Sequence, residues 1–134
     1  MKMKTKSFFA IAIMTITVGL TSCKKDKENP TITVNTPAEH VEHTIGSTVH
    51  IEATFTDDRD LKHYHVTVVD AATDGSHLHD FGLMDEGDIS GTTYDYHGHF
   101  DVPAGAPMMA WISFEVEDAE GKTTTLTWMQ HFAM

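Results

Sequence analysis

The chain of 134 residues has one cysteine and little positive charge. Because Cys23 is alone, the chain cannot form an internal disulfide. Nine Lys and Arg residues stand against 20 Asp and Glu residues, which gives a formal net charge of −11. Phosphate backbones and anionic headgroups repel an acidic surface, so this balance argues against nucleic acid and anionic membrane surfaces as partners. It favours cations.

The sequence also lacks an apolar run of the ~20 residues that a transmembrane helix needs. The most apolar stretch, Phe8 to Leu20, follows Lys2, Lys4 and Lys6 and ends in Leu20-Thr21-Ser22-Cys23. A positive start, a short apolar run and small residues at a cleavage point are typical of an export signal. The cysteine at that point makes the segment resemble a bacterial lipoprotein signal, in which the cysteine is lipidated and becomes the first mature residue.

This resemblance implies a signal peptide over 1–22, a lipidated Cys23 with a polar tether over 23–30, and one domain over 31–134. Several acyl chains on one residue would hold the protein firmly in a membrane, since a single chain binds only marginally. The charged tether, Lys24 to Pro30, resembles the surface-export tails of Bacteroidota-type lipoproteins. We therefore expect an outer membrane lipoprotein of the cell envelope, facing either the periplasm or the cell surface.

Apolar and polar residues alternate with period two through the folded part, and no helical pattern of useful length occurs. Turn residues such as Glu86-Gly87-Asp88 separate the alternating stretches. These stretches cover 31–34, 48–55, 63–69, 93–102, 108–116 and 123–132. Short strands at this spacing predict an all-β fold, an immunoglobulin-like antiparallel β-sandwich of about seven strands.

Two stretches, Phe55 to Leu61 and Phe114 to Lys122, are similar to parts of bacterial immunoglobulin-like domains. Together with the entry at Pro30-Thr31-Ile32, a His-rich middle and Phe100 to Gly105, they cover nearly the whole chain. In this respect the sequence resembles an uncharacterised family of Bacteroidota lipoproteins with a single immunoglobulin-like domain of unknown function. The resemblance implies a fold and a location, and no established activity.

All 10 histidines follow the signal, and six of them form three His-x-His pairs. On a strand, residues i and i+2 point to the same side, so each pair presents two imidazoles on one face. Imidazoles suit zinc, copper and nickel, and we expect zinc or copper. One strand supplies only half a site, so a neighbouring strand must supply the rest. The pairs are His63 and His65, His77 and His79, and His97 and His99.

The middle pair decides which metal site forms. We predict that the turn at Glu86-Gly87-Asp88 folds it against the His97 strand, so the site comprises His77, His79, His97 and His99. If the middle pair lies beside the His63 strand instead, the cluster comprises His63, His65, His77 and His79. The His63 and His97 strands should belong to different sheets. Possible additional ligands are His50 and Glu52, which point outward on a strand that often neighbours the His97 strand.

Acidic loops offer a competing interpretation, because carboxylates are the hard oxygen ligands that calcium prefers. One loop contains Asp57, Asp58 and Asp60, and another contains Glu117 and Asp118. These loops form a calcium site only if the strand order brings them to the same end. Asp is also common in turns because its side chain bonds the local backbone.

These features predict a lipid-anchored binding module of the cell envelope that holds a transition metal ion through His-x-His pairs. Two alternatives stay open. One is a structural or adhesive surface module that contacts another envelope protein or a glycan, with incidental histidines, and the other is a calcium-stabilised sandwich. We expect no enzyme, because the sequence shows no Ser-His-Asp elbow and no Gly-rich phosphate loop.

The methionines raise a copper(I) interpretation, which the sequence supports only weakly. Met108 and Met109 point to opposite faces of their predicted strand, and Met more often fills gaps in a core. By the same alternation, Trp111 should face outward beside Met109 and Ser113.

Overall fold

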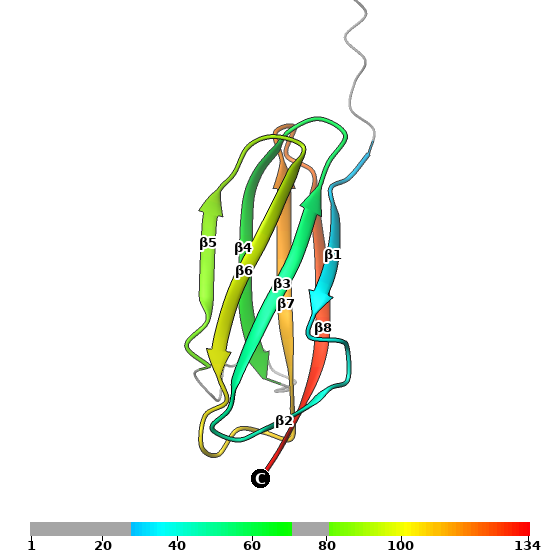
Figure 1. Cartoon of the computed structure of the whole chain (residues 1–134). Helices are drawn as coiled ribbons and strands as arrows, with labels where there is room; N and C mark the ends of the chain where they lie inside the picture. The colour runs from blue at the N-terminus through cyan, green and yellow to red at the C-terminus, as the bar shows by residue number, and fades with distance from the viewer. Residues whose placement is uncertain (1–27, 71–80) are drawn as a thin grey trace, which may run out of the picture.

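The computed structural model describes residues 28–70 and 81–134, which form eight strands in two sheets (Figure 1). The predicted all-β sandwich is confirmed, and no helix that could cross a membrane occurs in these two ranges. Six strands correspond to predicted ones, while β2 and β5 are additional. The strands are β1 (Thr31–Thr36), β2 (Glu42–Thr44), β3 (Thr48–Thr56), β4 (Leu61–Asp70), β5 (Met84–Asp88), β6 (Thr93–Asp101), β7 (Met109–Asp118) and β8 (Thr123–Ala133).

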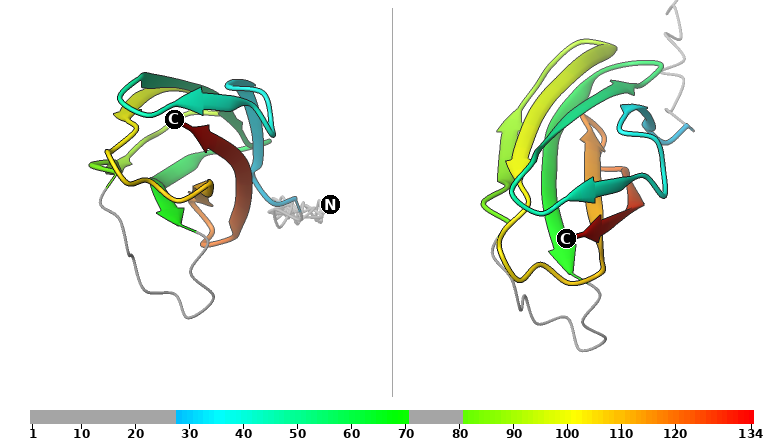
Figure 2. Two further views of the ribbon diagram at one scale, coloured as in Figure 1. Left: turned by 90° about the horizontal axis from the view of Figure 1, so that it is seen from below. Right: turned by 60° about the horizontal axis from the view of Figure 1, so that its bottom comes forward.

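One sheet has the strand order β1-β3-β6 and the other β2-β8-β7-β4-β5. Every neighbouring pair is antiparallel except β2 and β8, which are parallel. The first two strands belong to different sheets, so residues 37–41 cross from one sheet to the other; we call them the crossover segment. Figure 2 shows the two sheets as layers. Two layered antiparallel sheets with β4, β7 and β8 adjacent agree with the immunoglobulin-like expectation.

The core lies between the sheets and is rich in aromatic side chains. Phe55 is fully buried at its centre, with its ring centroid 6.0 to 6.5 Å from those of Tyr64, Tyr94, Tyr96 and Phe114. A second group, formed by Phe81, Phe100 and Phe132, packs with centroid distances of 5.6 to 6.3 Å. Burial of each such ring contributes about 1.5–3 kcal/mol. Because this packing fixes the inner faces, the alternate residues must face outward.

The predicted turn at Glu86-Gly87-Asp88 is wrong, because these residues lie in β5 and pair with β4. Gly87 stands opposite Tyr64, and a Cβ there would lie 3.2 Å from Tyr64 Cε1, so glycine makes room for this ring. The chain turns later instead, where Gly91 has a φ of 85°. Consequently β5 pairs with β4 and not with β6.

Gly98 has a similar role on β6, where it separates the outward-facing His97 and His99. A Cβ at Gly98 would lie 2.8 Å from Cζ of Tyr96, closer than such atoms approach in proteins, so the Tyr96 ring covers Gly98. The hydroxyl of Tyr96 is buried without a hydrogen-bond partner among the described residues. Burial raises the pKa of Tyr96 above the ordinary range.

We predict that Gly98→Ala destabilises the domain by about 1–3 kcal/mol, because the added methyl overpacks the core against Tyr96. Tyr96→Phe should be neutral or stabilising, since it removes a buried unsatisfied hydroxyl. The double variant should therefore lose less than Gly98→Ala alone. Urea unfolding measures all three, with Gly87→Ala as a milder control. Additive effects of the two substitutions would contradict the proposed contact.

Candidate functional site

Three histidines and a glutamate lie together on the outer face of β3 and β6. In the strand register His50 stands opposite His99 and Glu52 stands opposite His97. The His50 and His99 ring centroids are 6.1 Å apart, and His97 Nδ1 lies 3.8 Å from Glu52 Oε1. We call these four residues the β3–β6 histidine face. The structure thus joins His97 and His99, two of the predicted principal ligands, to His50 and Glu52.

Polar pairs continue this face in both directions. Thr48 Oγ1 donates to Asp101 Oδ1 at 2.5 Å, and Thr54 Oγ1 donates to Asp95 Oδ1 at 3.0 Å. No outward-facing residue of β1, β3 or β6 is Lys or Arg. The histidines therefore lie between two carboxylates in a region without positive side chains, which favours the approach of a cation.

The four side chains form two pairs rather than a closed site. Within residues 28–70 and 81–134, no three or more His, Cys, Asp and Glu residues are grouped so that they could hold a metal ion. The side chains of His97 and Glu52 are 69% and 53% exposed. Rotation about their χ angles would therefore disturb no core contact.

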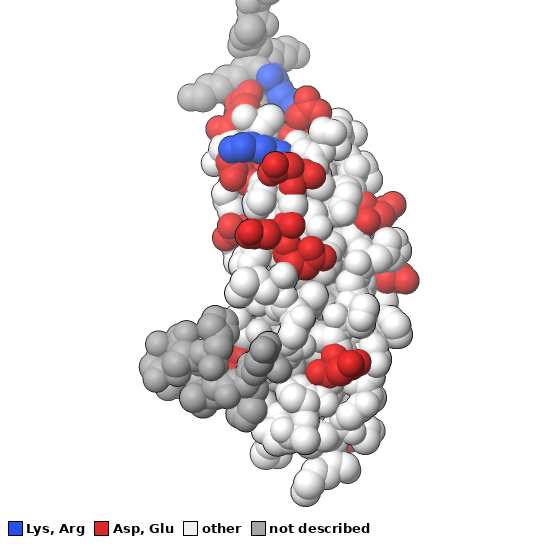
Figure 3. Space-filling model, turned by 90° about the vertical axis from the view of Figure 1, so that its left-hand side faces the viewer, with Lys and Arg blue, Asp and Glu red and all other residues white. Residues whose placement is uncertain are grey.

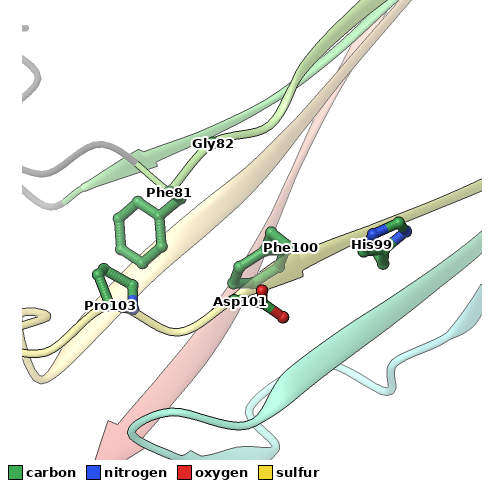
Figure 4. A pocket seen from close by; sticks show the side chains of 6 residues that line it. All are labelled: Phe81, Gly82, His99, Phe100, Asp101 and Pro103. Carbon is green, nitrogen blue, oxygen red and sulfur yellow. The ribbon is translucent and has the colours of Figure 1, made fainter.

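His77 and His79 lie outside the described residues. The turn predicted at 86–88, which would fold them against β6, is instead part of β5. The described chain resumes at Phe81, which lines a pocket of about 350 Å³ together with His99 (Figure 4). Figure 4 shows Phe81 and Pro103 at one end of this pocket and His99 at the other. The remaining lining residues are Gly82, Phe100 and Asp101.

His63 and His65 lie on the outer face of the other sheet, so the predicted separation from His97 and His99 is confirmed. Here carboxylates flank the imidazoles. His63 stands between Asp88 and Glu117, and His65 between Glu86 and Glu115. His63 Nδ1 lies 2.9 Å from Asp88 Oδ1. Figure 3, seen from the β5 side, shows most of its acidic side chains in the upper half, with few basic ones among them.

The strand order brings the two acidic loops to the same end, where the backbone N–H of Ala119 donates to the carbonyl of Asp60 at 2.8 Å. Asp57 Oδ2 accepts from Arg59 N at 2.9 Å, and Asp118 Oδ1 accepts from Glu120 N and Lys122 N, both at 2.8 Å. One oxygen of each carboxylate is therefore used to shape its own turn. Their other oxygens, Asp57 Oδ1 and Asp118 Oδ2, are buried without a hydrogen-bond partner in the described part of the chain.

Other polar groups near these loops are also paired. Asp60 Oδ1 accepts from Gly91 N at 3.2 Å, and Lys62 Nζ donates to Glu117 Oε1 at 2.6 Å. The hydrogen bond and the charge of Glu117 raise the pKa of Lys62. Glu117 is thus engaged by a neighbouring lysine, and Asp58 lies exposed in the same loop as Asp57.

A third group of histidines, which belongs to none of the His-x-His pairs, lies around the crossover segment. His40 Nδ1 is 3.3 Å from His131 Nε2, and His43 Nε2 is 2.7 Å from Gln130 Oε1. His40 and His131 are 91 positions apart in the sequence. No local spacing signals their contact, which depends on the pairing of β2 with β8.

Fold and surface together define an immunoglobulin-like β-sandwich domain with histidines on the outer faces of both sheets. The chain belongs to the family described as a domain of unknown function (DUF4625), whose model matches residues 21–130. The predicted membership of an uncharacterised family is thereby confirmed. The family description names no catalytic activity. No curated protein matches the chain.

We predict that Asp118→Ala lowers the free energy of unfolding by about 1–3 kcal/mol, because it leaves the two backbone N–H groups of the β7–β8 turn without their acceptor. Asp118→Asn should cost less, since its amide oxygen can still accept both hydrogen bonds. Thermal unfolding in calcium and in EDTA compares the variants. Stabilisation by calcium that is present in the parent and absent from Asp118→Asn would instead show that the carboxylate binds this ion.

Proposed function

We propose that the protein is a lipid-anchored binding module of the cell envelope that holds a transition metal ion, zinc or copper, on the β3–β6 histidine face. The observation that carries this proposal is the register of β3 and β6. It sets His50 directly opposite His99, with His97 and Glu52 in the adjacent row of the same face. Three imidazoles and one carboxylate are a ligand set that zinc accepts.

Side-chain geometry supports binding of an ion after small rotations. Directly opposite residues of an antiparallel pair have Cβ atoms about 4.5–5.5 Å apart. His50 and His99 can therefore bind one ion between them. His97, two residues from His99 on the same face, can supply a third nitrogen. The exposure of His97 and Glu52 leaves both side chains able to turn toward an ion held by the first pair.

Charge and chain connectivity also support a site here. Asp95 and Asp101 flank the face, which bears no lysine or arginine, so it attracts cations. Phe81 shares a pocket with His99 and follows the undescribed segment that contains His77 and His79. These two histidines are therefore our candidates for completing the coordination.

The position of the predicted lipid anchor agrees with an accessible metal face. Lys122 Nζ and Thr124 Oγ1 donate to the carbonyls of Glu28 and Pro30, so the domain begins beside the β7–β8 turn. In Figure 1 the chain enters at this upper end and β6 runs downward from it, so His97 lies at the midpoint of β6 and His99 lies beyond it. A tether formed by residues 23–30 would thus hold the domain by its upper end and leave the β3–β6 histidine face away from the membrane.

We expect zinc or copper to raise the melting temperature of the full chain at pH 7 and much less at pH 5, because ligating imidazoles must be unprotonated. The chain carries Cys23→Ser, so that no thiol competes, and is kept in detergent. An ion at about 100 times its Kd stabilises a fold by about 2.7 kcal/mol. His50→Gln with His99→Gln should remove the stabilisation by zinc, and His77→Gln with His79→Gln should weaken it.

The matched control is His63→Gln with His65→Gln on the other sheet, which should retain the stabilisation. Identical melting curves with and without metal would refute metal binding and favour the adhesive interpretation. Equal stabilisation in the His50/His99 variant and its parent would show that this face is not the site.

A further inference from the structure

His40 and His131 meet where the crossover segment passes the end of β8. Their nearest nitrogens, Nδ1 and Nε2, are 3.3 Å apart, and their ring centroids are 5.6 Å apart. We infer that these two imidazoles, together with the thioethers of Met109 and Met129, form a copper site on the five-stranded sheet. The four residues are called the histidine–methionine site below. It shares no residue with the β3–β6 histidine face, so it does not rest on the function proposed above.

The distance between the two nitrogens is the separation that a shared ion requires. Two imidazoles bound tetrahedrally to one ion at about 2.0–2.1 Å have nitrogens about 3.3 Å apart. Without an ion, one hydrogen between the two rings satisfies the same contact, so only one of the facing nitrogens carries it. Binding therefore replaces a shared hydrogen. Because the distances of 3.3 and 5.6 Å place both nitrogens on the line between the ring centroids, each ring must also tilt so that its nitrogen points at an ion beside that line.

The crossover segment is held against β8 before any ion binds. Gln130 is completely buried, and its Nε2 donates to the carbonyl of Ala38 at 3.1 Å. Trp128 Nε1 donates to the carbonyl of Pro37 at 2.9 Å. Two side chains of β8 thus fix the backbone just before His40. Sites that are held in place in this way lose less conformational freedom on binding.

Backbone contacts complete this support. His40 N donates to the carbonyl of Met129, and His131 N donates to the carbonyl of Val41, both at 2.9 Å. His43, which follows on β2, lies 2.7 Å from the oxygen of Gln130. The hydrogen bonds of Gln130 therefore connect the crossover segment, β2 and β8 immediately behind the two imidazoles.

His40 has a φ of 63°, the left-handed region that residues with a side chain adopt at a cost. It is the one described residue other than glycine with a positive φ. Such strained residues cluster at functional sites, where the surrounding structure maintains them. Glycine would suit this backbone better, so the imidazole rather than the turn accounts for a histidine here.

Two methionines supply the remaining donors. Met109 stands directly opposite His131 in the β7–β8 register, and Met129 precedes His131 by two residues on the same face of β8. Both are half-buried. In the described part of the chain, no third His, Cys, Asp or Glu joins His40 and His131 in a group that could hold a metal. Thioethers are thus the donors at hand, and thioethers with imidazoles select copper(I).

Anaerobic titration with copper(I), in competition with a chromophoric chelator, tests the site in the full chain carrying Cys23→Ser. His131→Gln should weaken copper(I) binding by more than about 100-fold, because even the outer partners of metal ligands account for about 10–100-fold. His40→Gly should weaken binding equally while the metal-free melting temperature stays unchanged or rises, since glycine relieves the strained backbone. This combination separates loss of a ligand from loss of the fold.

Met109→Leu with Met129→Leu keeps the apolar volume and removes both sulfur atoms. X-ray absorption of the copper(I) protein should show sulfur neighbours that this variant lacks. His63→Gln, elsewhere on the same sheet, is the control and should leave this binding intact, whereas His99→Gln should remove only an ion held by the β3–β6 histidine face. The site is refuted if copper(I) fails to bind, if His40→Gly and His131→Gln bind as tightly as their parent, or if only His99→Gln reduces binding. Absence of sulfur neighbours would refute the assignment of the methionines and of copper.

Discussion

The packing of Phe55 between the two sheets is the constraint on which the surface chemistry depends. Its ring lies within 6.5 Å of four other aromatic rings, three of them on tyrosines of β4 and β6. A strand has only two faces, so the residues that alternate with this core must point outward. A shift of β6 by one residue would bury His97 and His99 and expose Tyr96. The aromatic core therefore maintains the cross-strand pairing of His50 with His99.

The two described His-x-His pairs have different chemical surroundings. On β6, His97 and His99 stand opposite Glu52 and another histidine. On β4, His63 and His65 stand between carboxylates of both neighbouring strands. The first arrangement provides nitrogen donors to an approaching ion, whereas the second provides anionic partners to the imidazoles themselves. The identity of the neighbouring strand, rather than the His-x-His spacing, determines this difference.

Alternation alone was enough to predict six strands and their inner faces, and an immunoglobulin-like strand order predicted the separation of the two described histidine pairs. It failed at Glu86-Gly87-Asp88, where an acidic, glycine-containing stretch has the composition of a turn. Its glycine instead makes room for the ring of Tyr64 on the adjacent strand, a tertiary effect that local composition does not contain. The contact of His40 with His131 was equally inaccessible, because it joins a loop to the last strand through a parallel pairing of three residues.

The first two strands, β1 and β2, lie at the edges of different sheets, and this arrangement has a mechanical consequence. Tension applied at the amino-terminal side of the domain loads β1 first, and its ladder with β3 would peel apart from the entry point. Peeling would then reach residues 37 and 38, which Trp128 and Gln130 fasten to the opposite sheet. The crossover segment would therefore resist further peeling. A force that detaches β1 from β3 would leave the two sheets packed against each other.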